Sequence, residues 1–172
     1  MDLPKGFKDA THLLTISASV AESAANTFTQ EQVTLPLDPL NNEVFVVQAI
    51  NIDHNGPDAV VDTNTGMTVS VSTTSRTSVG TIADANVLAS RTTDFRSSAG
   101  FAGAVDVTRE VGETPASTMP YVGVIATDDF FIQIQGTNNT GARAGFVRLY
   151  GYRAKVTDAG VYSALVQSEL LS

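Results

Sequence analysis

Hydrophobic and polar side chains alternate along several stretches of the chain. Apolar residues occupy every second position from 14 to 20, and residues 66–74 (GMTVSVSTT) alternate in the same way. Period-two alternation is typical of a β-strand with one buried face. Residues 27–35 also alternate, and a cluster of Pro, Asp and Asn follows them as a turn signal. These three stretches are predicted to be strands.

Residues 43–53 (EVFVVQAINID) form the strongest predicted strand. Four consecutive apolar residues near its start place hydrophobic side chains on both faces, as expected for a central strand that is covered on both sides. Further strands are predicted at 121–127, 130–135 and 146–157. One face of the last of these strands carries Phe146, Arg148, Tyr150 and Tyr152.

The sequence patterns of the remaining segments fit more than one type of secondary structure. Residues 81–90 fit a short helix or a pair of strand fragments, and residues 91–108 fit a long loop with embedded strands. Residues 110–120 resemble a surface loop, and a loop that long is usually functional or an assembly contact. Residues 161–171 fit either a strand or a short terminal helix.

Together these elements predict the fold class. Roughly eight strands separated by turn signals, with little helix, predict an all-β protein with an antiparallel, jelly-roll-like β-sandwich. Residues 1–10, which contain Pro4 and Gly6, are predicted to be an N-terminal arm. Residues 11–172 are then a single β-sandwich domain.

Composition narrows the possible partners. Charged residues make up 16% of the chain and the net charge is −8, without a basic run at either end. Because protein–nucleic acid affinity comes largely from Lys and Arg contacts with phosphates, we expect no direct nucleic acid binding. The absence of cysteine excludes disulfides and thiolate zinc sites. We find no signal peptide pattern and no apolar stretch of membrane-span length, so we expect synthesis in a cytoplasm and no membrane span.

One loop carries a possible metal site. Oxygen ligands gather in the run DHNGPDAVVDTNTG. Calcium takes six to eight oxygens from carboxylates, amides and carbonyls, although this run lacks the ligand order of an EF-hand. Turn formation explains the same residue types without an ion, because Asn and Asp side chains hydrogen-bond to the backbone of bends. The candidate calcium ligands are Asp53, Asn55, Asp58 and Asp62; no other cofactor is expected.

Catalytic motifs have little support. His12 and His54 lie far apart and neither has a second histidine at metal-ligand spacing. Asp128 and Asp129 are adjacent, so in a strand their side chains would point to opposite faces. The chain has no G-x-S-x-G elbow, no G-x-G-x-x-G and no P-loop. We therefore expect a protein that is not an enzyme. The glycosylation sequon at 138–140 is interpreted as a loop.

A chain without a reactive constellation works through its surfaces. Self-assembly favours weakly charged faces, because desolvating an unpaired charge is costly. The segments LPLDPLNNEVFVVQAINIDHNGPD and FVRLYGYRAKV resemble stretches of small virion proteins of environmental bacterial or archaeal viruses. This resemblance implies a single jelly roll that self-assembles into a capsid shell through sheet edges and loops. It also implies a location in the virion, contacts with other virion proteins, and homo-oligomers such as trimers or pentamers.

Two other classes of protein stay open. A carbohydrate- or receptor-binding module, such as a virion spike or decoration protein, would present an exposed aromatic or calcium-lined pocket. Tyr121, Tyr150 or the loop 53–64 are its candidate residues, although core or interface packing is the default for tyrosine. An enzyme on a cupin scaffold would need more clustered histidines than the two present.

Overall fold

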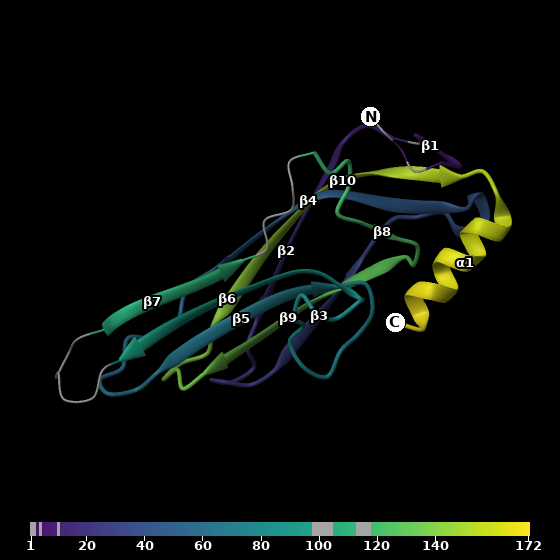
Figure 1. Cartoon of the computed structure of the whole chain (residues 1–172). Helices are drawn as coiled ribbons and strands as arrows, with labels where there is room; N and C mark the ends of the chain where they lie inside the picture. Colours follow the sequence, from purple (N-terminus) through teal and green to yellow (C-terminus); the bar gives the residue numbers. More distant parts are fainter. Residues whose placement is uncertain (1–2, 4, 10, 98–104, 113–117) are drawn as a thin grey trace.

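The structure, a computed structural model, describes residues 3, 5–9, 11–97, 105–112 and 118–172, with the backbone alone for 9 and 105–112. The described residues form two antiparallel five-stranded sheets and one α-helix (Figure 1). The elements in chain order are β1 (Phe7–Asp9), β2 (Leu14–Ala21), β3 (Thr29–Thr34), the 3-10 helix η1 (Pro39–Asn41), β4 (Glu43–His54), β5 (Thr65–Ser72), β6 (Val87–Ser97), β7 (Val105–Gly112), β8 (Gly123–Ile125), β9 (Asp129–Thr137), β10 (Ala144–Val156) and α1 (Ala159–Leu170).

The strand order is that of a jelly roll. In sheet A, β10 pairs with β2 and β1 on one side and with β4 on the other, and β4 continues to β8. Sheet B has the order β3-β9-β5-β6-β7. The pairs β2·β10, β3·β9, β4·β8 and β5·β6 are nested in sequence, as in one long hairpin that has been rolled up. This nesting defines the jelly-roll sandwich and confirms the predicted fold class.

The main core lies between the two sheets. It contains Phe45 and Val47 of β4, which face side chains of β5 and β9 such as Val69 and Ile134. Neighbouring residues of β4, Val44 and Val46, point the opposite way into a second apolar cluster, which α1 and the N-terminal residues cover. Strand β4 is therefore apolar on both faces because different elements bury each face, as its sequence predicts.

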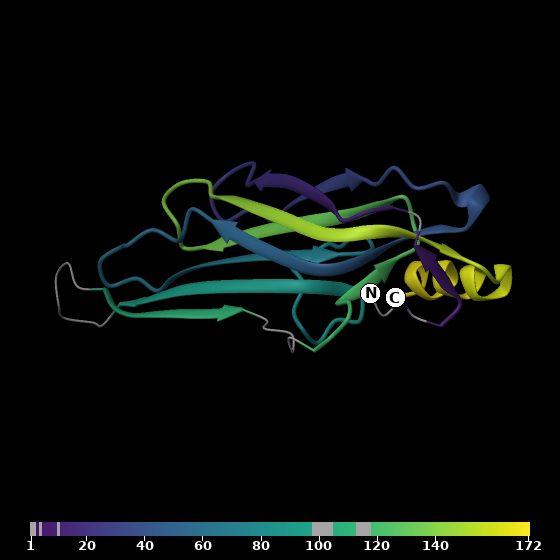
Figure 2. The ribbon, with the colours of Figure 1, turned by 90° about the horizontal axis from the view of Figure 1, so that it is seen from above.

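Figure 2 shows the two ends of the elongated molecule. Helix α1, β1 and η1 lie at one end, and the loops that join β4 to β5 and β9 to β10 lie at the other. Part of the predicted N-terminal arm is a strand of sheet A, because β1 pairs with the end of β10. Phe7 packs beside Leu3 against the second cluster.

Several segment predictions need correction. Residues 87–97 lie across a segment predicted as a short helix or strand fragments and one predicted as a long loop with embedded strands, and they form one continuous strand, β6. Residues 110–112, predicted as the start of a surface loop, continue strand β7. Residues 73–86 form an irregular connection, and the C-terminal segment is a helix rather than a strand. Asp158 caps that helix by accepting a hydrogen bond from Gly160 N at 2.7 Å, a signal for the helical alternative.

Candidate functional site

The structure shows the surroundings of the four candidate calcium ligands. Asp53 is exposed, and its Oδ1 accepts a hydrogen bond from His54 N at 2.8 Å. Asn55 Oδ1 accepts from Ala144 N at 2.9 Å, and Asp62 is exposed in a turn with a φ of 54°. Among the described residues, no three His, Asp or Glu side chains gather to hold a metal ion. Calcium binding stays a prediction, and turn chemistry accounts for the positions of these residues.

Asp58 serves as an anchor between loops. Its Oδ2 accepts hydrogen bonds from Thr140 Oγ1 at 2.7 Å and from Thr140 N at 2.9 Å, and its Oδ1 pairs with Arg143. These hydrogen bonds from Thr140, aided by the Arg143 guanidinium, lower the pKa of Asp58 below its ordinary value. The carboxylate is therefore ionised at neutral pH and already has its partners.

A buried acid extends this network. Glu22 is 5% exposed, and its carboxylate accepts hydrogen bonds from Gly136 N at 2.6 Å and Arg143 N at 2.9 Å. The buried Asn139 donates to Gly66 O at 2.9 Å and accepts from Asp58 N at 2.8 Å. The network fastens the loop between β9 and β10 to its neighbours, which is a structural task. Asn138 of the sequon is exposed in this loop.

His54 is also a structural residue. Its Nε2 lies 2.9 Å from Thr93 Oγ1, and its Nδ1 accepts a hydrogen bond from Gly56 N at 3.0 Å. Because Nδ1 accepts, the ring is neutral with its proton on Nε2. Burial, followed by the nearby Arg91 guanidinium, lowers the pKa of His54 and favours this neutral form. His12 lies apart from it and is exposed.

The paired aspartates and the tyrosines occupy different surroundings. Asp129 begins β9 and accepts a hydrogen bond from Gln32 of the neighbouring β3, while Asp128 is exposed. Tyr152 is 1% exposed in the second apolar cluster, against which Tyr121 also packs. Tyr150 instead is partly exposed on the outer side of sheet A.

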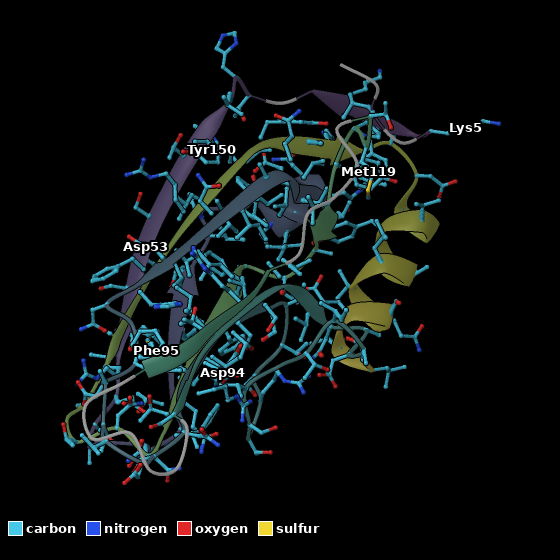
Figure 3. All side chains as sticks on the ribbon, turned by 60° about the vertical axis from the view of Figure 1, so that its left-hand side comes forward. Lys5, Asp53, Asp94, Phe95, Met119 and Tyr150 are labelled. Atoms are coloured by element: carbon cyan, nitrogen blue, oxygen red, sulfur yellow. The ribbon has the colours of Figure 1, made fainter. Side chains whose placement is uncertain are left out.

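The outer side of sheet A carries a hollow of about 550 Å³ that the sequence patterns did not predict. Strand β10 runs along its middle, between β2 and β4. The strand registers place outward side chains in three rows across the strands. These rows are Ser19–Phe146–Asp53, Ser17–Arg148–Asn51 and Thr15–Tyr150–Ala49. The side chains of the first two rows line the hollow, and Figure 3 shows Tyr150 and Asp53 on this side of the sheet.

Phe146 and Arg148 are the prominent groups on this face, which we call the sheet A outer face. Phe146 is 47% exposed. Arg148 Nε lies 3.3 Å from Ser17 Oγ, and no acidic side chain within the described part of the chain forms an ion pair with it. The other late arginines differ, since Arg143 pairs with Asp58 and Arg153 lies 3.7 Å from Glu43.

The second unusual surface is on α1. Glu169 is the only charged residue between positions 159 and 172, and it is 8% exposed. Its carboxylate accepts hydrogen bonds from Ala126 N at 2.6 Å and from the Thr127 hydroxyl. Burial raises the pKa of Glu169 above its ordinary value. The outward side of α1 therefore carries no charged side chain, while Leu170 and Leu171 are 64% and 79% exposed.

Comparisons with known proteins add no relative. No family model, curated protein or solved structure matches the chain. Within the described residues, no helix has the length and apolar character needed to cross a membrane.

Proposed function

We propose that this protein is a structural subunit of a virion, which self-assembles into a capsid shell. The subunits would form trimers or pentamers within the shell and contact other virion proteins. The single observation that carries the proposal is the outward surface of α1, a helix on a jelly-roll domain that exposes apolar groups without charge.

The fold is compatible with this function without selecting it. Jelly rolls build capsids, but the same architecture also serves lectins and cupins. A fold alone therefore does not imply a function, which depends on the surfaces that the fold presents.

The surface of α1 has the composition of a subunit contact. A helix that faces water normally carries charged residues on its outer side. On α1 the exposed apolar residues are instead Leu170 near its end and Val161 on another flank, and Leu171 follows directly after the helix; all three are at least 41% exposed. Leu170 and Leu171 border a groove of about 450 Å³ that Tyr162 and Val166 also line. Depletion of charge and enrichment in apolar and aromatic groups distinguish the cores of protein interfaces.

We assign a second copy of this chain as the occupant of the α1 surface. The chain has a net charge of −8, so copies repel each other, and this repulsion is least where the surfaces that meet carry no acidic residues. The α1 surface meets that requirement. The edges of the sheets and the loops provide further contacts, which a shell needs because each subunit has several neighbours.

Substitution of the exposed leucines tests this proposal. We expect Leu170→Glu and Leu171→Glu to reduce the oligomer mass measured by sedimentation velocity, because each places a charge inside the contact. Ile82→Glu is the matched control, since Ile82 is 73% exposed on the connection between β5 and β6. Circular dichroism checks that each variant is folded. If both leucine variants sediment like the unmodified chain, α1 is not the contact between subunits.

A carbohydrate- or receptor-binding module is the second candidate function. The exposed Phe146 ring beside the hollow on the sheet A outer face favours it. A shell subunit can carry such a site, so the two functions are compatible.

A further inference from the structure

We propose that the sheet A outer face binds a saccharide chain that carries carboxylate groups. The site consists of the aromatic ring of Phe146, the guanidinium of Arg148, and the small polar side chains beside them. This inference rests on the second candidate function, for which it names the ligand class, and it does not require shell assembly.

The geometry of the face suits a flat, extended ligand. Phe146, Arg148 and Tyr150 alternate along β10 and point outward, because Val147 and Leu149 between them are buried in the core. Outward side chains two residues apart in a strand are separated by about 6.7 Å. The neighbouring outward residues on β2 and β4, such as Ser17 and Asn51, have shorter side chains than Phe146 and Arg148. The aromatic ring and the guanidinium group therefore stand above the sheet.

Each group has a chemical counterpart on a sugar chain. The face of the Phe146 ring offers apolar contact to the C–H face of a pyranose ring. Asn51, Asp53, Ser17 and Ser19 line the hollow and provide donors and acceptors for hydroxyl groups. A hollow of about 550 Å³ lies within the usual range of ligand sites.

Arg148 selects an acidic saccharide over a neutral one. In a chain with 18 acidic and 10 basic residues, an exposed arginine without a carboxylate partner in the described structure stands out. A guanidinium binds a carboxylate through two parallel hydrogen bonds, which gives both charge and orientation. A negatively charged sugar ring over Arg148 supplies that carboxylate.

A nucleic acid or a second subunit fits this face less well. The hollow holds a single arginine together with the acidic Asp53, whereas phosphate chains require several basic residues. A subunit contact favours an uncharged apolar surface such as that of α1, while this face is lined by serines, an asparagine and two charged groups.

The test measures binding of two probes to the full chain by isothermal titration calorimetry. The probes are the neutral hexasaccharide cellohexaose and a hexasaccharide of the same linkage in which one glucose is replaced by glucuronate, in buffer with a chelator to exclude calcium bridging. We expect the probe with the single carboxylate to bind more tightly by at least about tenfold, because only it pairs with Arg148. We expect Arg148→Gln to abolish this preference and leave the weaker binding of cellohexaose unchanged.

Two further variants complete the test. Phe146→Ala should weaken both probes by about threefold or more, because stacking does not depend on charge. Arg96→Gln is the control for charge, since Arg96 is 50% exposed on sheet B, and both affinities should stay within about twofold of the unmodified chain.

Three results of the binding measurements would overturn the proposal. These are an absence of binding to either probe at millimolar concentration, equal affinity for both probes, and an effect of Arg96→Gln as large as that of Arg148→Gln. Loss of oligomers in Arg148→Gln would also overturn it, because the face would then be a subunit contact. If the chain assembles into particles but binds neither sugar, the proposed shell assembly is unaffected. The two proposals can therefore be refuted independently.

Discussion

Gln133 of β9 is fully buried on the side of sheet B that faces away from the core. Its replacement tests whether its hydrogen bonds stabilise the connection 73–86, which covers that side. Its amide donates to Ser72 Oγ at 2.7 Å and to Gln30 Oε1 at 3.0 Å, and it accepts from Ser70 Oγ at 2.9 Å. Ser70 Oγ also accepts from Gly80 N at 2.8 Å. Partners of Gln133 bind the connection 73–86 to the sheet, since Ser70 accepts from Gly80 N and Gln30 Oε1 accepts from Arg76 N at 2.8 Å.

Gln133→Leu keeps approximately the same volume but removes all three bonds. Ser72 still donates to Thr74 O, and Gln30 still accepts from Arg76 N. The Ser70 hydroxyl loses its acceptor, and an unsatisfied buried donor costs about 1–3 kcal/mol. The other two bonds contribute roughly 0.5–1.5 kcal/mol each, and the apolar leucine side chain offsets part of this loss. We expect a net loss of about 2–4 kcal/mol.

Urea denaturation at one fixed protein concentration measures this change, because the stability of an assembling protein depends on concentration. Hydrogen exchange should also show that residues 73–86 lose protection. Gln135→Leu is the matched control: Gln135 lies two residues along the same strand face and is partly exposed. It should change stability by less than about 0.5 kcal/mol. The reasoning is wrong if both leucine variants are equally stable.

Two other predictions concern packing and pH. Gly151→Ala should destabilise the protein by about 1–3 kcal/mol in thermal denaturation, because the added Cβ would lie 2.3 Å from Val46 O. Gly141→Ala, where the nearest atom is 3.6 Å away, should change it little, and equal effects would contradict the packing argument. Burial raises the pKa of Glu169 in the folded protein above its ordinary value of 4.5. The stability that protonated Glu169 contributes is therefore fully present below pH 4.5 and is lost as the pH rises through the raised pKa. The stability of the unmodified chain relative to Glu169→Gln should therefore fall between pH 4 and pH 7, and a constant difference would contradict this reasoning.

The strands were predictable because their pattern is local. Alternation in β2 and β5 and the apolar run in β4 report the two faces of a strand directly. The sequence also predicted a jelly-roll-like sandwich. Its strand order required the structure, since the pairing of β10 with β4 joins segments about a hundred residues apart.

Other features could not be predicted because they depend on distant contacts. The polar faces of β5 and β9 have the same sequence pattern whether water or a loop covers them. In the structure the connection 73–86 covers this side, and Ser70 and Gln133 are completely buried. In sequence, the Asp and Asn residues of 53–62 fit turn formation and also left calcium binding open. The actual partners of Asp58 could not be predicted, because they lie more than eighty residues away. The sequence placed Phe146, Arg148 and Tyr150 on one face, yet the pairing with β2 and β4 that forms the hollow was not visible.

The mass and shape of the purified, unmodified chain test the central claim most directly. Light scattering combined with negative-stain electron microscopy measures both. Our account predicts closed particles or uniform trimers or pentamers. A monomer that persists at high protein concentration, and that salt and calcium leave unchanged, would contradict assembly as the function of this protein.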